Sequence, residues 1–306
     1  MISSTDQMGN VIQLKAYPKR IISLVPSQTE LLHSLGLEEE VIGITKFCVH
    51  PQQWFKNKTR IGGTKAINIQ KIKALQPDLV IANKEENVKE QIEELRAFAH
   101  VWTSDINNLD DALEMIEKVG LITGKSPQAS ELIQEVKNVF LQISFKSEQA
   151  GSIQGKHTLP GMIAASNEMA TPSLPPVKIA YLIWQNPYMT VGGDTFIADM
   201  IRRCGLQNVF EDQYRYPVIS PEELQNSGCD ILLFSSEPFP FTQKHIDALH
   251  MQLPNIKMLL VDGEMFSWYG SRLLTAALYI KQLNATINSL MNLTFNTALI
   301  LTAPQG

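Results

Sequence analysis

Cysteine is scarce in this sequence. Only Cys48, Cys204 and Cys229 occur among 306 residues, and no two of them form a CxxC pair. An odd number of cysteines without framework spacing argues against a disulfide scaffold and against a zinc ribbon. Free cysteine packs as a small hydrophobic residue in most proteins, so we expect three half-buried side chains without a chemical role.

A patch of positive charge is also missing. The formal net charge is −5, and the 26 lysines and arginines are scattered along the chain. Nucleic-acid binding needs clustered cations that neutralise phosphates. We therefore expect no nucleic-acid partner.

Long hydrophobic runs are absent. The apolar tail at 293–302 is ten residues long, which is too short to span a bilayer, so we expect it to pack as a final segment of a soluble protein. The first 20 residues show no basic segment followed by an apolar run, which is the signal-peptide pattern. The chain is either cytosolic, or exported with a signal sequence that lies outside this sequence.

Sequence motifs for nucleotide binding and for serine hydrolases are missing. There is no Walker A, GxGxxG or GxSxG motif, and no pairing of a nucleophile with a base is apparent. The glycine-rich stretch TVGGDTF at 190–196 predicts a turn into a helix capped by Asp194 or Thr195. A phosphate cradle there is the less favoured alternative.

The chain does contain a regular alternation of strands and helices. Its length is about twice that of a usual domain, which predicts two domains or lobes. The expected strands are apolar throughout, which is typical of a parallel sheet covered on both faces. In the first half they lie at 21–25, 41–45, 78–82 and 100–105. A helix is expected after the first strand, with Ser27 or Thr29 as its cap.

The second half reads as a copy of the first. Residues 178–184 take the place of the first strand, Asp230 that of Asp78, and Asp262 that of Asp105. A single repeat of this length predicts two similar α/β lobes rather than a solenoid.

One long amphipathic helix is expected between the two halves, at 127–148, because its apolar residues keep the spacing of a helix face. We expect four segments along the chain: an N-terminal lobe at 1–126, a connecting helix at 127–149, a flexible insert at 150–176, and a C-terminal lobe at 177–306.

Aromatic residues gather where ligands bind in such folds. In open parallel sheets, ligands lie outside the carboxyl ends of the strands, so two facing lobes predict a cleft. Trp184 and Trp268 fall at strand ends and Trp54 in a loop, while Trp102 lies inside a strand. Aromatic residues in loops are typical of ligand pockets. The alternative is that they pack the lobe interface as ordinary core.

A metal contact is conceivable in the loop FCVHP. Cys48 and His50 lie two residues apart, and thiolate and imidazole are both ligands of soft metals. Two ligands do not complete a tetrahedral site, so Glu85, Glu237 or Glu264 would have to supply the others. A single axial contact to a cofactor metal needs one residue, for which His50 is the better candidate.

The order of the motifs resembles a known family. RIISLVPSQTELLHSLGL, IQKIKALQPDLVIA, NPYMTVGGDTFI, YPVISPEEL and DGEMFSWYGSRL are similar to segments of ABC-transporter substrate-binding proteins of the helical-backbone metal-receptor class. That class includes receptors for vitamin B12, siderophores and haem, and the resemblance covers roughly residues 8–285. It implies two α/β lobes joined by one long helix that limits closure. It also implies a large ligand held by aromatic side chains, with the cobalamin-binding branch as the best match.

The resemblance and the loops together predict the site. A planar macrocycle would stack on aromatic side chains, charged side chains would meet its peripheral amides or carboxylates, and His50 would approach its metal. The candidate ligand-binding residues are Ser27, Gln28, Phe47, His50, Trp54, Lys84, Glu85, Trp184, Tyr188, Glu237, Phe239, Phe241, Glu264, Phe266, Trp268, Tyr269 and Arg272. We expect 264–272 to form one wall of the cleft.

The resemblance also implies a membrane partner. In this class an acidic residue on each lobe docks onto arginines of the permease; the matching positions are Asp194 and Gln70, the latter an amide. We therefore expect a monomeric, non-enzymatic receptor for a metal chelate (a corrinoid, haem or a ferric siderophore) in the periplasm or cell envelope. The alternative is a cytosolic enzyme or carrier of tetrapyrrole or metal metabolism, since fold does not fix function.

Overall fold

A computed structural model describes residues 1–149, 175–292 and 299–300. All but the last two residues of the predicted insert at 150–176 lie outside this part. Among the described residues, none of the helices combines the length and hydropathy needed to cross a membrane.

The N lobe (elements β1 to α5) is built on a five-stranded parallel sheet with the order β5-β4-β3-β6-β7. Every residue of β6 is buried, as expected for a central strand covered on both faces. The strands are β3 (Ile21–Ser23), β4 (Val41–Ile44), β5 (Thr59–Arg60), β6 (Leu79–Asn83) and β7 (His100–Ser104). The helices are α1 (Pro26–Ser34), α2 (Gln52–Asn57), α3 (Ile69–Ala74), α4 (Lys89–Arg96) and α5 (Leu109–Thr123).

An antiparallel hairpin at the N-terminus was not predicted from the sequence. It consists of β1 (Ile2–Thr5) and β2 (Val11–Leu14), and it contacts α5 and β7. Four residues per strand give too short an alternation to separate a strand from a loop by pattern alone.

The C lobe (elements β8 to β14) repeats this architecture. Its five-stranded parallel sheet has the order β10-β8-β12-β13-β14, and β9 pairs with β11 in a separate ribbon. The strands are β8 (Lys178–Leu182), β9 (Tyr188–Met189), β10 (Gln207–Asn208), β11 (Val218–Ile219), β12 (Ile231–Ser235), β13 (Lys257–Val261) and β14 (Leu299–Ile300). The helices are α7 (Phe196–Arg203), α8 (Pro221–Asn226), α9 (Gln243–His250), α10 (Glu264–Ser267) and α11 (Arg272–Asn292). Within the apolar tail, β14 thus adds a strand to the sheet edge.

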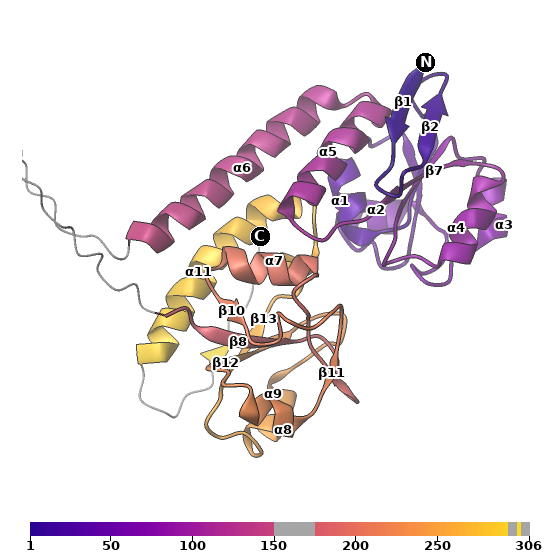
Figure 1. The fold of residues 1–306 in the computed structure, drawn as a ribbon. Coiled ribbons are helices and arrows are strands. Elements are labelled where there is room, and N and C mark those ends of the chain that lie inside the picture. The colour runs from indigo at the N-terminus through magenta and orange to yellow at the C-terminus, as the bar shows by residue number, and fades with distance from the viewer. Residues whose placement is uncertain (150–174, 293–298, 301–306) are drawn as a thin grey trace, which may run out of the picture.

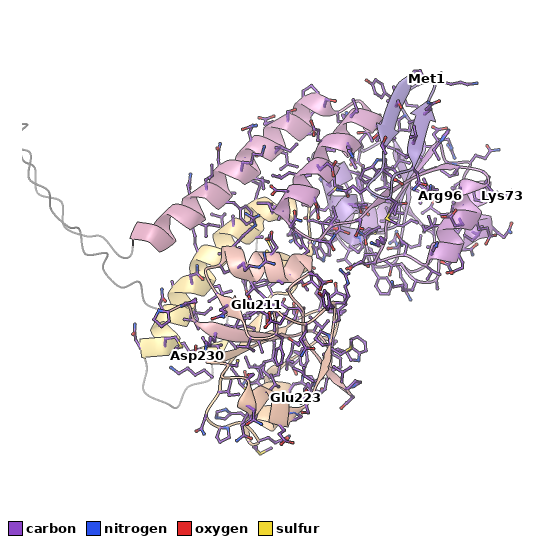
Figure 2. All side chains as sticks on the ribbon, viewed as in Figure 1. Met1, Lys73, Arg96, Glu211, Glu223 and Asp230 are labelled. Atoms are coloured by element: carbon purple, nitrogen blue, oxygen red, sulfur yellow. The ribbon has the colours of Figure 1, made fainter. Side chains whose placement is uncertain are left out.

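The predicted equivalence of Asp78 and Asp230 is confirmed by their hydrogen bonds. The carboxylate of Asp78 accepts the backbone N–H of Arg20 at 2.9 Å, and its own N–H is donated to the carbonyl of Arg20 at 2.8 Å. Asp230 makes the same two bonds with Lys178, both at 2.8 Å (Figure 2 labels Asp230). Each aspartate fixes the start of one central strand against its neighbour.

One long helix connects the two halves, as expected. Helix α6 (Ser126–Gln149) begins after Gly124, whose φ of +74° ends α5, and it packs along α5 and α11 (Figure 1). Because α6 contacts helices of both lobes, it braces them along one side.

Two local predictions about helix starts had different outcomes. Thr195 caps α7 by accepting the N–H of Ala198, as predicted. The prediction that Ser27 or Thr29 caps α1 was wrong: the cap position is Val25, and Pro26 opens the helix. Proline suits the first helical position because its missing N–H has no partner there anyway.

Candidate functional site

Loops that follow the strands of the two sheets meet between the lobes. The hydroxyl of Tyr216 donates to Glu85 Oε2 at 2.8 Å, and Arg215 forms an ion pair with the same carboxylate. On another side, the backbone N–H of Leu109 donates to Asp199 Oδ2 at 2.9 Å. We call the loops at this junction the interlobe region, namely residues 46–51, 83–87, 105–108, 184–190, 214–217, 235–241 and 262–272.

Arg272 is the centre of a charged network between the lobes. Its guanidinium contacts both carboxylate oxygens of Glu30, at 2.8 and 2.9 Å, and lies 3.3 Å from Glu264. His50 Nε2 lies 3.5 Å from the other oxygen of Glu264. Arg272 also stacks over the ring of Trp268, at 4.9 Å from its centroid. Three predicted residues, His50, Glu264 and Arg272, are therefore brought together.

The pKa values in this network follow from burial and charge. Burial raises the pKa of Glu30, and the attraction of Arg272 only partly opposes that effect. Burial would also raise the pKa of Glu264, but its contacts with His50 and Arg272 outweigh burial and lower it. The contact with Glu264 raises the pKa of His50.

Several of the predicted aromatic residues are buried in packing rather than exposed on an open wall. Phe266 has no exposed surface, Trp268 and Tyr269 are each 7% exposed, and Phe241 is 3% exposed. Phe266 packs on Tyr181 and Tyr279, and Phe241 packs on Phe234 and Phe239, all within the C lobe, so these rings offer little or no free surface to a planar ligand in this structure. That 264–272 forms one wall of the cleft therefore stays a prediction, carried by its polar members rather than by its buried rings.

Trp54 departs furthest from its predicted place. It lies in the short helix α2 rather than in a loop, and it is fully buried. Its indole N–H donates to Glu38 at 2.5 Å, and its ring packs edge-on against His33. Trp54 is thus a core residue of the N lobe.

Four other aromatic residues keep accessible surface. Phe47 is 50% exposed and Trp184 is 41% exposed, while Tyr188 and Phe239 are partly buried. Trp184 and Phe239 pack against each other with centroids 5.7 Å apart. These are the predicted aromatic residues that a ligand could contact in this conformation.

A carboxylate that the sequence analysis overlooked lies in the interlobe region. Glu86 follows β6, directly after the predicted Lys84 and Glu85, and its side chain is exposed. Its pKa is nonetheless raised, because desolvation by the surrounding protein outweighs the attraction of Lys65. It interacts electrostatically with Glu237 and Tyr269 of the other lobe. The sequence offered one indication of its role: Glu86 follows the predicted residues Lys84 and Glu85 in the segment NKEEN.

Glu237 is a second carboxyl of the interlobe region, contributed by the C lobe. Its Oε1 accepts hydrogen bonds from the hydroxyl of Ser267 at 2.6 Å and from the indole of Trp268 at 2.9 Å. Burial raises its pKa to about 7, and the neighbouring Glu264 and Glu86 add to that effect. The predicted Glu237 is therefore a fixed carboxyl that titrates near neutrality.

The remaining predicted residues of the N lobe are engaged locally. Lys84 forms an ion pair with Asp105 at 2.6 Å. Gln28 is fully buried and donates to the hydroxyl of Ser104, and Ser27 is 4% exposed. These two residues lie under the interlobe region rather than on its surface.

The described residues contain no group of three His, Cys, Asp or Glu side chains close enough to hold a metal ion. Cys48 is fully buried, is hydrogen-bonded to Thr29 and Thr45, and has a raised pKa because of burial. A neutral buried thiol is a poor metal ligand. His50, with 42% of its side chain exposed, is the more accessible of the two candidates.

The two predicted docking positions differ in their surroundings. Asp194 is partly exposed, accepts the N–H of Arg215 at 2.6 Å and lies 3.7 Å from the Arg215 guanidinium. Gln70 lies exposed at the start of α3.

The fold and this junction define a two-lobed binding protein with a single connecting helix. The family described as periplasmic binding protein matches residues 21–252, so the chain belongs to that family, whose members bind substrates rather than transform them.

Individual relatives agree with this family. The chain is 24% identical to the vitamin B12-binding protein of Pectobacterium carotovorum, over 86% of this chain and 87% of the relative. Two solved structures share its fold at lower identity. The periplasmic vitamin B12 binding protein of Vibrio cholerae is 19% identical with a TM-score of 0.66, covering 89% of this chain and 98% of that one. A periplasmic haem binding protein of Pseudomonas aeruginosa is 18% identical with a TM-score of 0.72, covering 92% and 96%.

Proposed function

We propose that this protein is the solute-binding component of an ABC importer and that it binds a metal chelate in the interlobe region. The observation that carries the proposal is the contact between the exposed Trp184 and the partly buried Phe239, close in the chain to the fixed carboxyl of Glu237, at the carboxyl end of the C-lobe sheet. Apolar rings with a few placed polar groups are what a macrocycle needs.

A cobalamin-like corrinoid is the leading ligand. The relative from Pectobacterium carotovorum and the structure from Vibrio cholerae are both named for vitamin B12. Haem and ferric siderophores are the alternatives, because proteins that bind haem and a ferric-hydroxamate transport system share the fold.

The test is a titration with hydroxocobalamin, haemin and ferrichrome, followed by tryptophan fluorescence and by the visible spectrum of each chelate. We expect saturable binding of one chelate class. If none of the three gives a saturable change, the proposed function is wrong. The matched pair of variants is Trp184→Ala, which removes an exposed ring of the interlobe region, and Tyr17→Ala, which removes the ring of a 51% exposed residue outside that region. Only the first should weaken binding.

We propose docking to the permease through Asp194. The side chain keeps its charge and partial exposure, but Arg215 of the same chain competes for it. Gln70 offers an amide in place of a second carboxylate. In a binding assay with permease reconstituted in nanodiscs, Asp194→Asn should weaken docking and Gln70→Glu should strengthen it, since charge-assisted hydrogen bonds are the stronger ones.

One observation favours a catalytic alternative. Burial raises the pKa of Glu237 to about 7, and its carboxylate accepts a hydrogen bond from the hydroxyl of Ser267, a pairing that is compatible with acid–base chemistry. We propose that the protein instead returns its ligand unchanged. Mass spectrometry of the chelate recovered after prolonged incubation checks this, and any protein-dependent change of its mass would favour the enzyme.

A further inference from the structure

The arginines of the interlobe region are already paired with carboxylates of the protein. Arg272 contacts Glu30 and Glu264, and Arg215 forms an ion pair with Glu85. These cations are therefore not free to receive an anionic ligand unless an existing pair breaks.

Of the two lysines in this region, Lys84 pairs with Asp105, whereas Lys46 is exposed, lies over the ring of Phe47 and has no ion pair within the described part of the chain. Lys65, outside the region, donates to the backbone carbonyl of Glu85. Lys65 is also the one cation that lowers the pKa of Glu86, yet burial outweighs it.

Three carboxylates of the region remain without an ion pair. Within the described part of the chain, Glu86, Glu237 and Asp262 have no Lys, Arg or His nitrogen within 4 Å; Asp262 accepts the backbone N–H of Glu264. Glu237 uses Oε1 for both of its hydrogen bonds, so Oε2 is left for another donor. Glu86 and Glu237 interact with each other across the junction and raise the local negative potential.

We infer that the interlobe region selects a chelate that presents hydrogen-bond donors, such as amides, and carries no carboxylates toward Glu86 and Glu237. This inference rests on the proposed function and narrows its ligand class to neutral or cationic chelates. An anionic chelate would meet two unpaired carboxylates at a site where protein limits screening by water. An amide-rich chelate would find acceptors on both lobes.

The test compares chelates that differ mainly in peripheral charge. Dicyanocobinamide carries peripheral amides, and dicyanocobyrinic acid carries carboxylates at the corresponding positions. At pH 8 we expect the amide form to bind wild type at least about 30-fold more tightly, because each unfavourable charge contact is worth roughly tenfold. In Glu86→Gln/Glu237→Gln the ratio should fall below about fivefold, because amide side chains remove the repulsion.

The control variant is Glu94→Gln, which removes a carboxylate exposed on α4 and should leave the ratio as in wild type. If the double variant does not fold, the same affinity ratio is measured in the single variants Glu86→Gln and Glu237→Gln. Equal affinity for the two corrinoids, or an unchanged ratio in the folded variants, would overturn the inference and leave the proposed function standing.

Binding of iron chelates with different net charge tests the inference independently of the corrinoids. Ferrichrome is neutral, whereas haemin and ferric enterobactin are anionic. Tight binding of either anionic chelate would overturn the inference. Selective binding of ferrichrome would support it even if neither corrinoid binds. If no chelate binds, the proposed function fails, and the inference fails with it.

Discussion

The ion pair between Arg272 and Glu30 should couple the stabilities of the two lobes. The guanidinium holds both carboxylate oxygens at 2.8 and 2.9 Å, and the side chains are only 12% and 23% exposed. Exposed pairs contribute about 0.2–1 kcal/mol. For a bidentate pair with this burial, we expect a coupling energy of about 1.5–3 kcal/mol in a double-mutant cycle of Glu30→Gln and Arg272→Gln.

The two single variants should differ. In Arg272→Gln, Glu30 stays buried without a cation, so we expect a loss of about 3 kcal/mol in the free energy of unfolding at pH 8. In Glu30→Gln, Arg272 keeps Glu264 as a partner, and the loss should be about 2 kcal/mol. Because burial raises the pKa of Glu30, protonation of Glu30 should relieve part of the Arg272→Gln loss as the pH falls from 8.

The assay is urea unfolding followed by tryptophan fluorescence and circular dichroism, with coincidence of the two probes as the check on two-state behaviour. The control is the cycle of Glu114→Gln and Lys118→Gln within α5. That pair has a similar distance, 2.8 Å, but its side chains are 48% and 27% exposed, so its coupling should be about 0.3–0.5 kcal/mol. A coupling across the lobes that does not exceed this control would refute the reasoning.

Three further predictions concern single positions. Glu237→Gln should flatten the dependence of the free energy of unfolding on pH. The raised pKa of Glu237 stabilises the wild-type fold at low pH, and this contribution of about 3 kcal/mol is lost as the pH rises from about 5 to 8. Urea unfolding at several pH values measures the difference. A parallel slope in wild type and variant would contradict it. Gly193→Ala should lower the free energy of unfolding by more than about 2 kcal/mol, because the added Cβ would lie 2.2 Å from the carbonyl oxygen of Glu211. Gly205→Ala should lower it by about 1 kcal/mol, because Gly205 has φ +75° but open space around it. Thermal melts that rank the two variants in the opposite order would be decisive against this. Trp54→Phe should lower stability by about 1–2 kcal/mol without changing chelate affinity, whereas Trp184→Ala should do the reverse; calorimetric titration and melting curves separate the two.

Much of the fold followed from periodic patterns. The continuous apolar runs predicted parallel strands, and the spacing of Leu132, Val136 and Phe140 predicted a long helix that the structure places at Ser126–Gln149. The repeat also located Asp78 and Asp230, because a carboxylate that fixes a strand start recurs when the scaffold is duplicated.

The site was harder to predict, because exposure depends on what the other lobe covers. The pattern put Phe266 and Trp268 at a strand end, but the sequence does not show that α1 lies against this segment. Gly270, with φ +102°, comes close to Leu31 and to the carbonyl of Ser27, and this close approach buries its neighbours. Trp54 was predicted to lie in a loop, but it lies in a helix of six residues, which is too short for the periodicity of the sequence to reveal.

Hydrogen–deuterium exchange with a bound chelate tests the central claim most directly. With saturating hydroxocobalamin, or whichever chelate of the panel binds, we predict slower exchange in 83–87 of the N lobe and in 184–190 and 235–241 of the C lobe. Protection confined to one lobe, or located away from these segments, would contradict binding between the lobes.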